Sequence, residues 1–304
     1  GSLQWPDGFP DARVAIVTGG ARGIGKGIST ALIRSGHMVV VASRDRQRCQ
    51  EEVRHLNDDV RPSRHALPEG RYAMAVECDV GKPGDLERTF DEAIERFGRV
   101  DVIVNNAGTA ERADLLESEP GEFERVMRVN TTAVLTSTQL AIKDYLRNRR
   151  PDKPLVIINI SSCYSAPADH FVAGGSLPAY FASKCAVNSL IWSTLQYVTS
   201  ESFRSKYPNH PVLVYGIAPF GFESDMLVDD AKQDGFETTQ EWAYANNPSR
   251  QLGDPMLIGE LVCKLISDEK PYPNGEILLI DGDNSIDRLQ DYYWTPKPKA
   301  PESK

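Results

Sequence analysis

Cysteine is scarce in this chain of 304 residues, and its placement argues against two kinds of architecture. The five cysteines are odd in number and scattered, without a Cys-x-x-Cys pair or the Cys/His spacing of a zinc site. We therefore expect neither a disulfide framework nor a metal site, and these cysteines are typical of small buried side chains. The pattern favours a reducing compartment and predicts a cytoplasmic protein.

Long hydrophobic runs and an excess of positive charge are also missing. No stretch reaches the roughly 18 consecutive apolar residues of a membrane-spanning helix, and the start lacks the pattern of a secretory signal. Lys and Arg number 34 against 43 Asp and Glu, which gives a formal charge of −9. That sign opposes binding to a phosphate backbone. We therefore expect neither nucleic acid nor a membrane as a partner.

What the sequence does contain is a regular alternation of apolar strands and amphipathic helices. Seven mostly continuous apolar runs separated by helices are typical of a largely parallel sheet with helices on both faces. The sequence predicts a single-domain, doubly wound α/β fold over residues 13–283, between an extension (1–12) and a tail (284–304). The expected strands are 14–18, 38–43, 72–78, 102–105, 155–161, 212–218 and 277–280, and the expected helices are 24–33, 47–56, 85–97, 131–147 and 179–200.

A glycine-rich turn lies directly between the first expected strand and the first expected helix. It runs from Gly19 through Arg22, Gly23 and Ile24 to Gly25. Glycines at this junction allow the backbone to approach a pyrophosphate that sits on the helix N-terminus. The alternative is a plain turn, because turns collect glycine. The position at the first strand-to-helix junction favours a dinucleotide site.

The end of the second strand bears on which dinucleotide fits. Ser43 and Arg44 stand there, where an acidic residue would accept from a ribose 2′-hydroxyl. A guanidinium can hold a 2′-phosphate through two hydrogen bonds, and Arg22 can add charge from the glycine loop. NADP is therefore favoured over NAD. The alternative assigns Arg44 to a solvated helix start and lets Asp45 hold the ribose.

Several motifs in a fixed order resemble those of the short-chain dehydrogenase/reductase family, which has a Rossmann fold. The resemblance runs from about Arg13 to Asp283. The residues that carry it are Thr18, Gly19, Gly23 and Gly25 of the glycine loop, Asp79-Val80, Asn105-Asn106-Ala107-Gly108, Asn130, Ser162, and Tyr180 with Lys184 in Y-x-x-x-K. It implies an oxidoreductase with a nicotinamide cofactor.

Tyr180 and Lys184 are four residues apart, so on a helix they project from one face. An ammonium group beside a phenol favours the phenolate, and we expect it to lower the pKa of Tyr180, the general acid or base. A strand-end serine can stabilise the developing oxyanion. Ser162 is preferred to Ser161 because the family's serine is the second of such a pair. A merely structural Tyr–Lys pair is the alternative.

The resemblance also assigns the other residues. It implies that Lys184 binds the nicotinamide ribose and that Asn130 holds a water in a proton relay, although asparagine could instead cap a helix starting at Thr131. It further implies that Phe220 departs from the family's usual glycine. The implied cofactor contacts are Asp79 and Val80 at the adenine, Asn106, Ala107 and Gly108 along the adenosine, and Pro219, Phe222 and Ser224 near the nicotinamide.

Substrate choice is expected in two enlarged segments. Eighteen positions separate Ser162 from Tyr180, five more than is usual in the family, and the surplus falls in the loop 166–177, which carries His170. Tyr164 faces the same side as Ser162 if the strand continues. With His170 and Phe220, it is a candidate substrate contact. Residues 227–247 predict a helical lid whose aromatics either favour a bulky or flat substrate or pack the lid onto the body.

The sequence therefore predicts an NADP(H)-dependent oxidoreductase acting on a small-molecule carbonyl or alcohol. Reduction of an enoyl thioester or epimerisation on the same scaffold is the alternative within catalysis. A non-catalytic NADP-binding regulator is the alternative from another class. The resemblance further implies a homodimer or homotetramer through the helices 131–147 and 179–200.

Overall fold

A computed structural model describes residues 12–60, 72–111, 113, 115–147, 153–165, 177–267, 269 and 271–288. The strands are β1 (Val14–Thr18), β2 (Met38–Ser43), β3 (Ala73–Glu77), β4 (Val102–Asn105), β5 (Leu155–Ile160), β6 (Val212–Pro219), β7 (Ile277–Ile280) and β8 (Ile286–Arg288). The helices are α1 (Gly23–Arg34), α2 (Arg46–Asp58), α3 (Asp85–Phe97), α4 (Pro120–Met127), α5 (Ala133–Arg147), α6 (Pro178–Thr199), α7 (Glu201–Lys206), α8 (Asp225–Gln233), α9 (Thr239–Asn246) and α10 (Pro255–Ile266).

The strands form one sheet in the order β3-β2-β1-β4-β5-β6-β7-β8. All seven predicted strands are present and pair in parallel. An eighth strand, β8, pairs antiparallel with β7 and comes from the segment predicted as a tail. The order reverses between β1 and β4, which is the position where open sheets of this kind bind ligands beyond the carboxyl ends of their strands.

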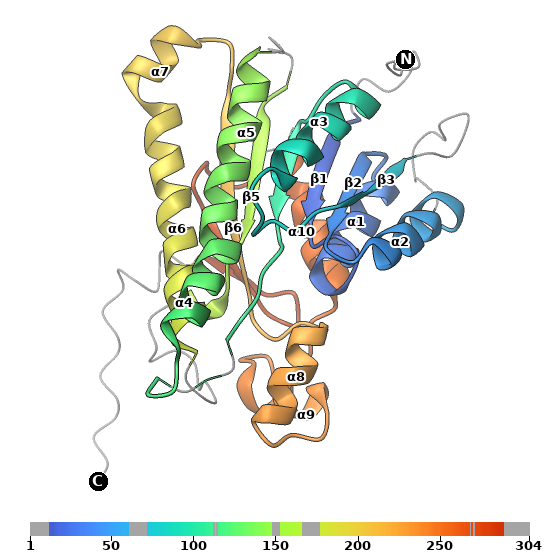
Figure 1. The fold of residues 1–304 in the computed structure, drawn as a ribbon, viewed down its shortest axis with the longest axis vertical. Coiled ribbons are helices and arrows are strands. Elements are labelled where there is room, and N and C mark those ends of the chain that lie inside the picture. Colours follow the sequence, from blue (N-terminus) through green and yellow to red (C-terminus); the bar gives the residue numbers. More distant parts are fainter. Residues whose placement is uncertain are drawn as a thin grey trace.

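Helices cover both faces of the sheet (Figure 1). Alternate residues of β1 show why, because Val14 and Ile16 belong to one hydrophobic cluster while Ala15 and Val17 belong to the other. The first cluster contains buried residues of α3, α5 and α6, and the second contains buried residues of α1, α2 and α10. None of the helices in the described ranges combines the length and apolar character that a bilayer crossing requires.

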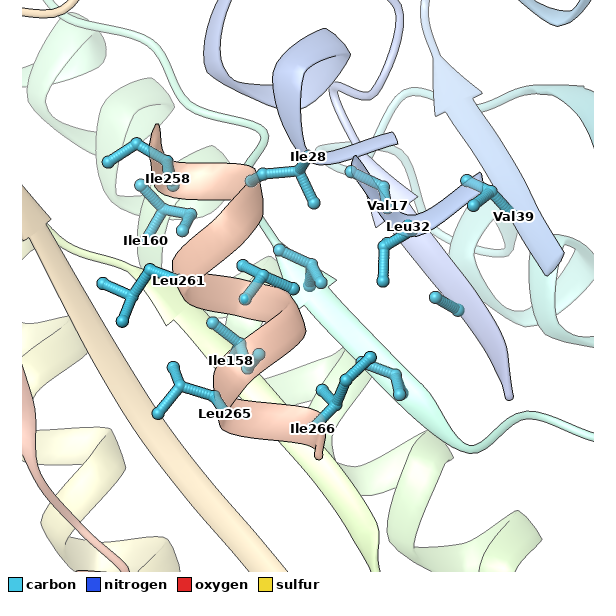
Figure 2. Packing of buried hydrophobic residues seen from close by; sticks show 14 of the residues in the cluster. Val17, Ile28, Leu32, Val39, Ile158, Ile160, Ile258, Leu261, Leu265 and Ile266 are labelled. Carbon is cyan, nitrogen blue, oxygen red and sulfur yellow. The ribbon is translucent and has the colours of Figure 1, made fainter. Parts of the chain in front are cut away.

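Helix α10 was absent from the predicted elements, although it is central to the second face. Its side chains pack on α1 and on β5 (Figure 2). The two helices touch through glycines, since a Cβ on Gly27 would lie 2.4 Å from the carbonyl carbon of Pro255. Asp254 caps α10, and Pro255 occupies its first turn. This Asp-Pro pair was the available sequence signal for the start of the helix.

The segment predicted as a lid, and called the lid below, is helical and forms α8 and α9, which extend beyond the sheet below α1 and β6 in Figure 1. Ser224 caps α8, and Thr238 forms a capping box with Glu241 at the start of α9. Asn247 ties the lid to the segment after β6, because its side chain accepts from the Gly221 N–H at 2.9 Å and donates to the Gly221 carbonyl at 3.0 Å. The lid is therefore anchored at the edge of the sheet where the candidate site lies.

Candidate active site

One cleft at the carboxyl edge of the sheet brings the predicted cofactor and catalytic residues together. Its empty volume of about 1460 Å³ includes space open to solvent, and it extends from the glycine loop to Tyr180 on α6 and Trp242 on α9. The predicted residues that line it are Gly19, Arg22, Gly23, Ile24, Ser43, Arg44, Asp79, Val80, Asn106, Ala107, Gly108, Ser162, Tyr164, Tyr180, Lys184, Pro219, Phe220, Phe222 and Ser224.

The glycine loop is held against the turn that follows β4. The Thr18 hydroxyl accepts from the backbone N–H groups of Asn106 and Ala107, both at 3.0 Å, and Asn106 Nδ2 donates to the Thr18 carbonyl at 2.9 Å. Gly25 supports this loop from beneath, because a Cβ there would lie 2.1 Å from the Gly19 carbonyl oxygen. Helix α1 begins without a side-chain cap. Its first N–H groups are therefore available to an anion, and the cradle fits a pyrophosphate.

The adenosine end of the cleft carries the cations predicted to select NADP, with Arg44 exposed beside Ser43. The Asp45 carboxylate, proposed in the alternative as the ribose acceptor, instead caps α2 by accepting from the Arg48 N–H at 3.0 Å. Arg22 reaches across the cleft to Asp225 of the lid, with Nη1 2.6 Å from Oδ2. Arg48 also reaches that oxygen, at 3.0 Å. These two hydrogen bonds lower the pKa of Asp225.

Arg48 and Asp225 were not among the predicted site residues. They lie 177 positions apart, so no local pattern pairs them. The only available signal was that Asp225 directly follows Ser224 in a segment already assigned to the cofactor. The structure therefore adds an ion-paired link between the glycine loop, α2 and the lid.

Asn130 lies inside a continuous helical path and does not cap a helix start, so the capping alternative was wrong. Residues Arg128–Thr132 form a π-helical turn between α4 and α5, an insertion often found at functional sites. The Asn130 side chain accepts from the Thr109 N–H at 2.9 Å and donates to the Thr109 carbonyl at 2.8 Å. Its Nδ2 also donates to the Ser183 hydroxyl at 2.9 Å. Asn130 thus joins the segment after β4 to helix α6.

Ser162, Tyr180 and Lys184 meet in the same part of the cleft. Lys184 is 5% exposed, and its Nζ lies 5.5 Å from the centroid of the Tyr180 ring while donating to the Ile160 carbonyl at 2.8 Å. Burial lowers the pKa of Lys184 to about 8. The hydroxyl of Ser161, by contrast, donates to Asn188 Oδ1 at 2.7 Å. Because the Ser161 hydroxyl is bonded to Asn188 of α6, Ser162 is the serine that hydrogen-bonds the phenol of Tyr180.

The expected lowering of the Tyr180 pKa was wrong for this structure. Loss of solvent around the phenol raises its pKa, and a hydrogen bond with Ser162 lowers it only in part. Desolvation disfavours the charged phenolate, and the ammonium of Lys184 is directed at a backbone carbonyl. Tyr180 is therefore held as a neutral phenol, which is the form that donates a proton.

Tyr164 lines the cleft, but not for the reason given by the sequence. β5 ends at Ile160, and Cys163–Ser165 form a 3₁₀ turn, so the strand does not continue to Tyr164. This turn places the Tyr164 ring edge-on to Tyr180, with centroids 6.1 Å apart, and stacked on Phe181 at 4.8 Å. His170 lies outside the described residues.

The cleft's other aromatics come from β6 and the lid. Phe220, which replaces the family's usual glycine, is half-buried. Its N–H donates to the Ile280 carbonyl at 3.1 Å, so the backbone at this position continues the pairing of β6 with β7. Trp242 both lines the cleft and packs within the lid, where its Nε1 donates to Asp234 at 2.7 Å. Phe236 packs within the lid as well, whereas Tyr244 is 62% exposed. The packing interpretation of the lid aromatics thus describes Phe236, and Trp242 also faces the cleft.

Comparisons with known proteins agree with this arrangement. The family model described as short chain dehydrogenase matches residues 13–235. A hydroxynaphthalene reductase-like protein of Metarhizium majus (strain ARSEF 297) is 27% identical over 278 residues, which cover 89% of this chain and 94% of that protein. The sex determination protein tasselseed-2 of Zea mays is 31% identical over 304 residues, covering 90% of this chain and 81% of that protein. A solved structure, the Pseudomonas aeruginosa RhlG/NADP active-site complex, has a TM-score of 0.73 at 27% identity and covers 89% of this chain and 95% of its own.

Proposed function

We propose that this chain, which belongs to the short-chain dehydrogenase/reductase family, is an NADP(H)-dependent oxidoreductase that interconverts a carbonyl and a secondary alcohol. The observation that carries the proposal is the single cleft shared by the glycine loop, Arg44 and the group of Ser162, Tyr180 and Lys184. A dinucleotide bound with its pyrophosphate on the glycine loop would have its nicotinamide end beside Ser162, Tyr180 and Lys184. The chemistry and the cofactor therefore share one location.

Several features support NADP over NAD. Arg44 stands at the end of β2, and Asp45 is engaged in capping α2. A guanidinium there suits a 2′-phosphate, whereas no other carboxylate follows β2 directly. The similar RhlG structure is an NADP complex, which is consistent with this choice. Gly19, Gly23 and the uncapped start of α1 would hold the pyrophosphate, and Lys184 the nicotinamide ribose.

The bound cofactor supplies or accepts a hydride, and the protein manages the oxygen and its proton. Ser162 would hydrogen-bond the carbonyl oxygen and stabilise its developing charge. Tyr180 would donate a proton to that oxygen, for which its raised pKa keeps it protonated. Lys184 would stabilise the phenolate that remains. Asn130 would support this end of the site and its water.

We propose a flat, aromatic ketone as the substrate class. Tyr164, Phe220 and Trp242 line the cleft around Tyr180, and aromatic rings favour stacked or edge-on contact with a planar ligand. A relative described as hydroxynaphthalene reductase-like supports the same class.

A carbonyl panel tests the proposal directly. Purified protein is given NADPH with flat aromatic ketones, small aliphatic ketones and enoyl thioesters, and the absorbance of NADPH is followed. We expect turnover with aromatic ketones and a larger thermal shift with NADPH than with NADH. Turnover of the enoyl thioester alone would contradict the carbonyl reaction, and cofactor binding without any turnover would favour the non-catalytic regulator.

We also propose a homodimer or homotetramer built through α5 and α6. Leu135 of α5 and Trp192 and Tyr197 of α6 are large apolar side chains that are 42%, 37% and 57% exposed. Large apolar side chains exposed on these two helices suit a contact with another chain. Light scattering should give a mass of two or four chains, and a monomeric mass would contradict this assembly.

A further inference from the structure

Helix α6, which carries Tyr180 and Lys184, has no cap of its own. Its N-cap residue is Leu177, whose side chain forms no capping hydrogen bond, and the first helical residue is Pro178. The next two backbone N–H groups, of Ala179 and Tyr180, precede the first i→i−4 bond of the helix, in which Phe181 donates to Leu177. These two groups need acceptors from elsewhere in the chain.

Glu111 supplies both acceptors from a distant segment. Its Oε1 accepts from the Ala179 N–H and its Oε2 accepts from the Tyr180 N–H at 3.0 Å. The two residues lie 68 and 69 positions away in the sequence. Each carboxylate oxygen therefore accepts from one N–H group. An N-cap side chain next to the helix in sequence would satisfy only one of the two.

Burial shows that this contact is built into the fold. Glu111 is 1% exposed, and burying a carboxylate is costly unless hydrogen bonds and opposite charge compensate it. The positive end of the α6 dipole and the two N–H donors provide that compensation. A surface glutamate that reached the helix by chance would remain partly solvated.

The segment that carries Glu111 is itself fixed. It follows the turn Asn105–Gly108 of the cofactor cleft, and both backbone groups of Thr109 are bonded to Asn130. Asn130 bonds Ser183, whose hydroxyl donates to the Tyr180 carbonyl at 2.7 Å. The backbone of Tyr180 is thus held at its N–H by Glu111 and at its carbonyl by Ser183.

We propose that Glu111 is the positioning residue of Tyr180, fixing the first turn of α6 so that the phenol meets Ser162 and the substrate oxygen. The inference rests on the proposed function. Through this one buried carboxylate, the segment after the turn Asn105–Gly108 on the cofactor side of the cleft is connected to α6, which carries Tyr180. Glu111 acts through Tyr180 and touches no reacting atom.

The place of this contact gives the role a signature that a general loss of packing would not produce. Glu111 holds the backbone N–H groups of Ala179 and Tyr180 and does not line the cofactor cleft. Its removal should therefore lower kcat for ketone reduction and leave the KM for NADPH unchanged, and Glu111→Asp, which keeps a carboxylate acceptor at the start of α6, should recover part of the lost kcat.

The test compares Glu111→Gln and Glu111→Asp with Glu52→Gln. Glu52 is the matched control, because it is 5% exposed and ion-paired with Lys26 on α1 and α2, away from α6. Hydrogen exchange over 178–184 and the kcat and KM for ketone reduction are measured for each. In Glu111→Gln we expect faster exchange, a kcat at least ten-fold lower and a KM for NADPH within two-fold of wild type, with an intermediate kcat in Glu111→Asp. Glu52→Gln should change none of these.

The outcomes separate the inference from the proposed function. If wild type reduces no carbonyl, the proposed function fails, and the exchange data still decide whether Glu111 holds the first turn of α6. If wild type is active and Glu111→Gln keeps its kcat, or loses kcat and NADPH affinity to the same extent, the inference is wrong. Should Glu111→Gln fail to fold, Glu111→Asp decides. It keeps the carboxylate with a shorter reach, so a reduced kcat with an unchanged KM for NADPH supports the role, and an unchanged kcat contradicts it.

Discussion

The two walls of the cleft are built in different ways. The glycine-loop wall presents backbone to the cleft at Gly19, Gly23 and the start of α1, with Arg44 at its edge, and Thr18 ties the loop to the neighbouring turn. The opposite wall is made of side chains from α6, the turn after β5 and the lid. The first wall carries the proposed pyrophosphate cradle, whereas the groups proposed to act on the substrate lie on the second.

The walls are joined at two places by carboxylates. Asp225 of the lid holds Arg22 and Arg48 at the adenosine end, and Glu111 holds the start of α6 at the catalytic end. The first carboxylate is exposed and the second is buried. The exposed link should therefore adjust binding by a small factor, while the buried link should affect the chemical step.

The largest effect is expected at the catalytic wall. Tyr180→Phe removes the proposed proton donor and keeps the ring, so kcat should fall by about 10²–10⁴-fold. The Kd of NADPH, measured by fluorescence titration, should stay within two-fold of wild type, because the cradle is on the other wall. A loss of NADPH affinity as large as the loss of kcat would contradict the division between the walls.

The next effect concerns the stability contribution of Lys184. Burial lowers its pKa from 10.5 to about 8, so between these pH values the unfolded chain binds a proton that the native chain lacks. Its contribution to the free energy of unfolding therefore rises with pH in this window, by about 3 kcal/mol in all, and the burial penalty is fully present below pH 8. In urea unfolding, the free energy of unfolding of wild type should rise by this amount relative to that of Lys184→Met between pH 8 and 10.5. A constant difference would show that Lys184 is not desolvated.

At the cofactor wall, Arg44→Gln should weaken NADPH binding by about 10–100-fold and leave NADH binding unchanged. A hydrogen bond to a charged group contributes about 1.5–3 kcal/mol, and only NADPH has the phosphate to receive it. Arg46→Gln is the control, because Arg46 is the first residue of α2 and does not line this cleft. Equal losses for both cofactors would remove the selective role of Arg44.

The smallest effect is expected at the exposed link. Asp225→Asn frees Arg22 and Arg48 for the cofactor's phosphates, so NADPH should bind up to about five-fold more tightly, in keeping with the worth of an exposed ion pair. The gain should shrink as salt is raised. Weaker binding in this variant would indicate that Asp225 holds the two arginines in the binding geometry.

The fold predicted from sequence is confirmed where the signal was local, because the alternation of strands and helices is set by neighbouring residues. The glycine turn before α1 and the four-residue spacing of Tyr180 and Lys184 on α6 are local in the same sense. The links through Asp225 and Glu111 join segments far apart in the chain, which no spacing reveals. The direction of the Tyr180 pKa also escaped prediction, because desolvation depends on every segment packed around the ring. Tyr164 faces the cleft through a 3₁₀ turn that the strand pattern did not anticipate.

The central claim is that this cleft transfers hydride to a carbonyl carbon with Tyr180 as proton donor. The most direct test incubates NADPH deuterated at the transferable position of its nicotinamide with an aromatic ketone, and then analyses the alcohol by mass spectrometry. We predict one deuterium on the carbinol carbon with wild type and almost none with Tyr180→Phe. Binding of NADPH without deuterium transfer to any ketone, or undiminished transfer by Tyr180→Phe, would contradict the account.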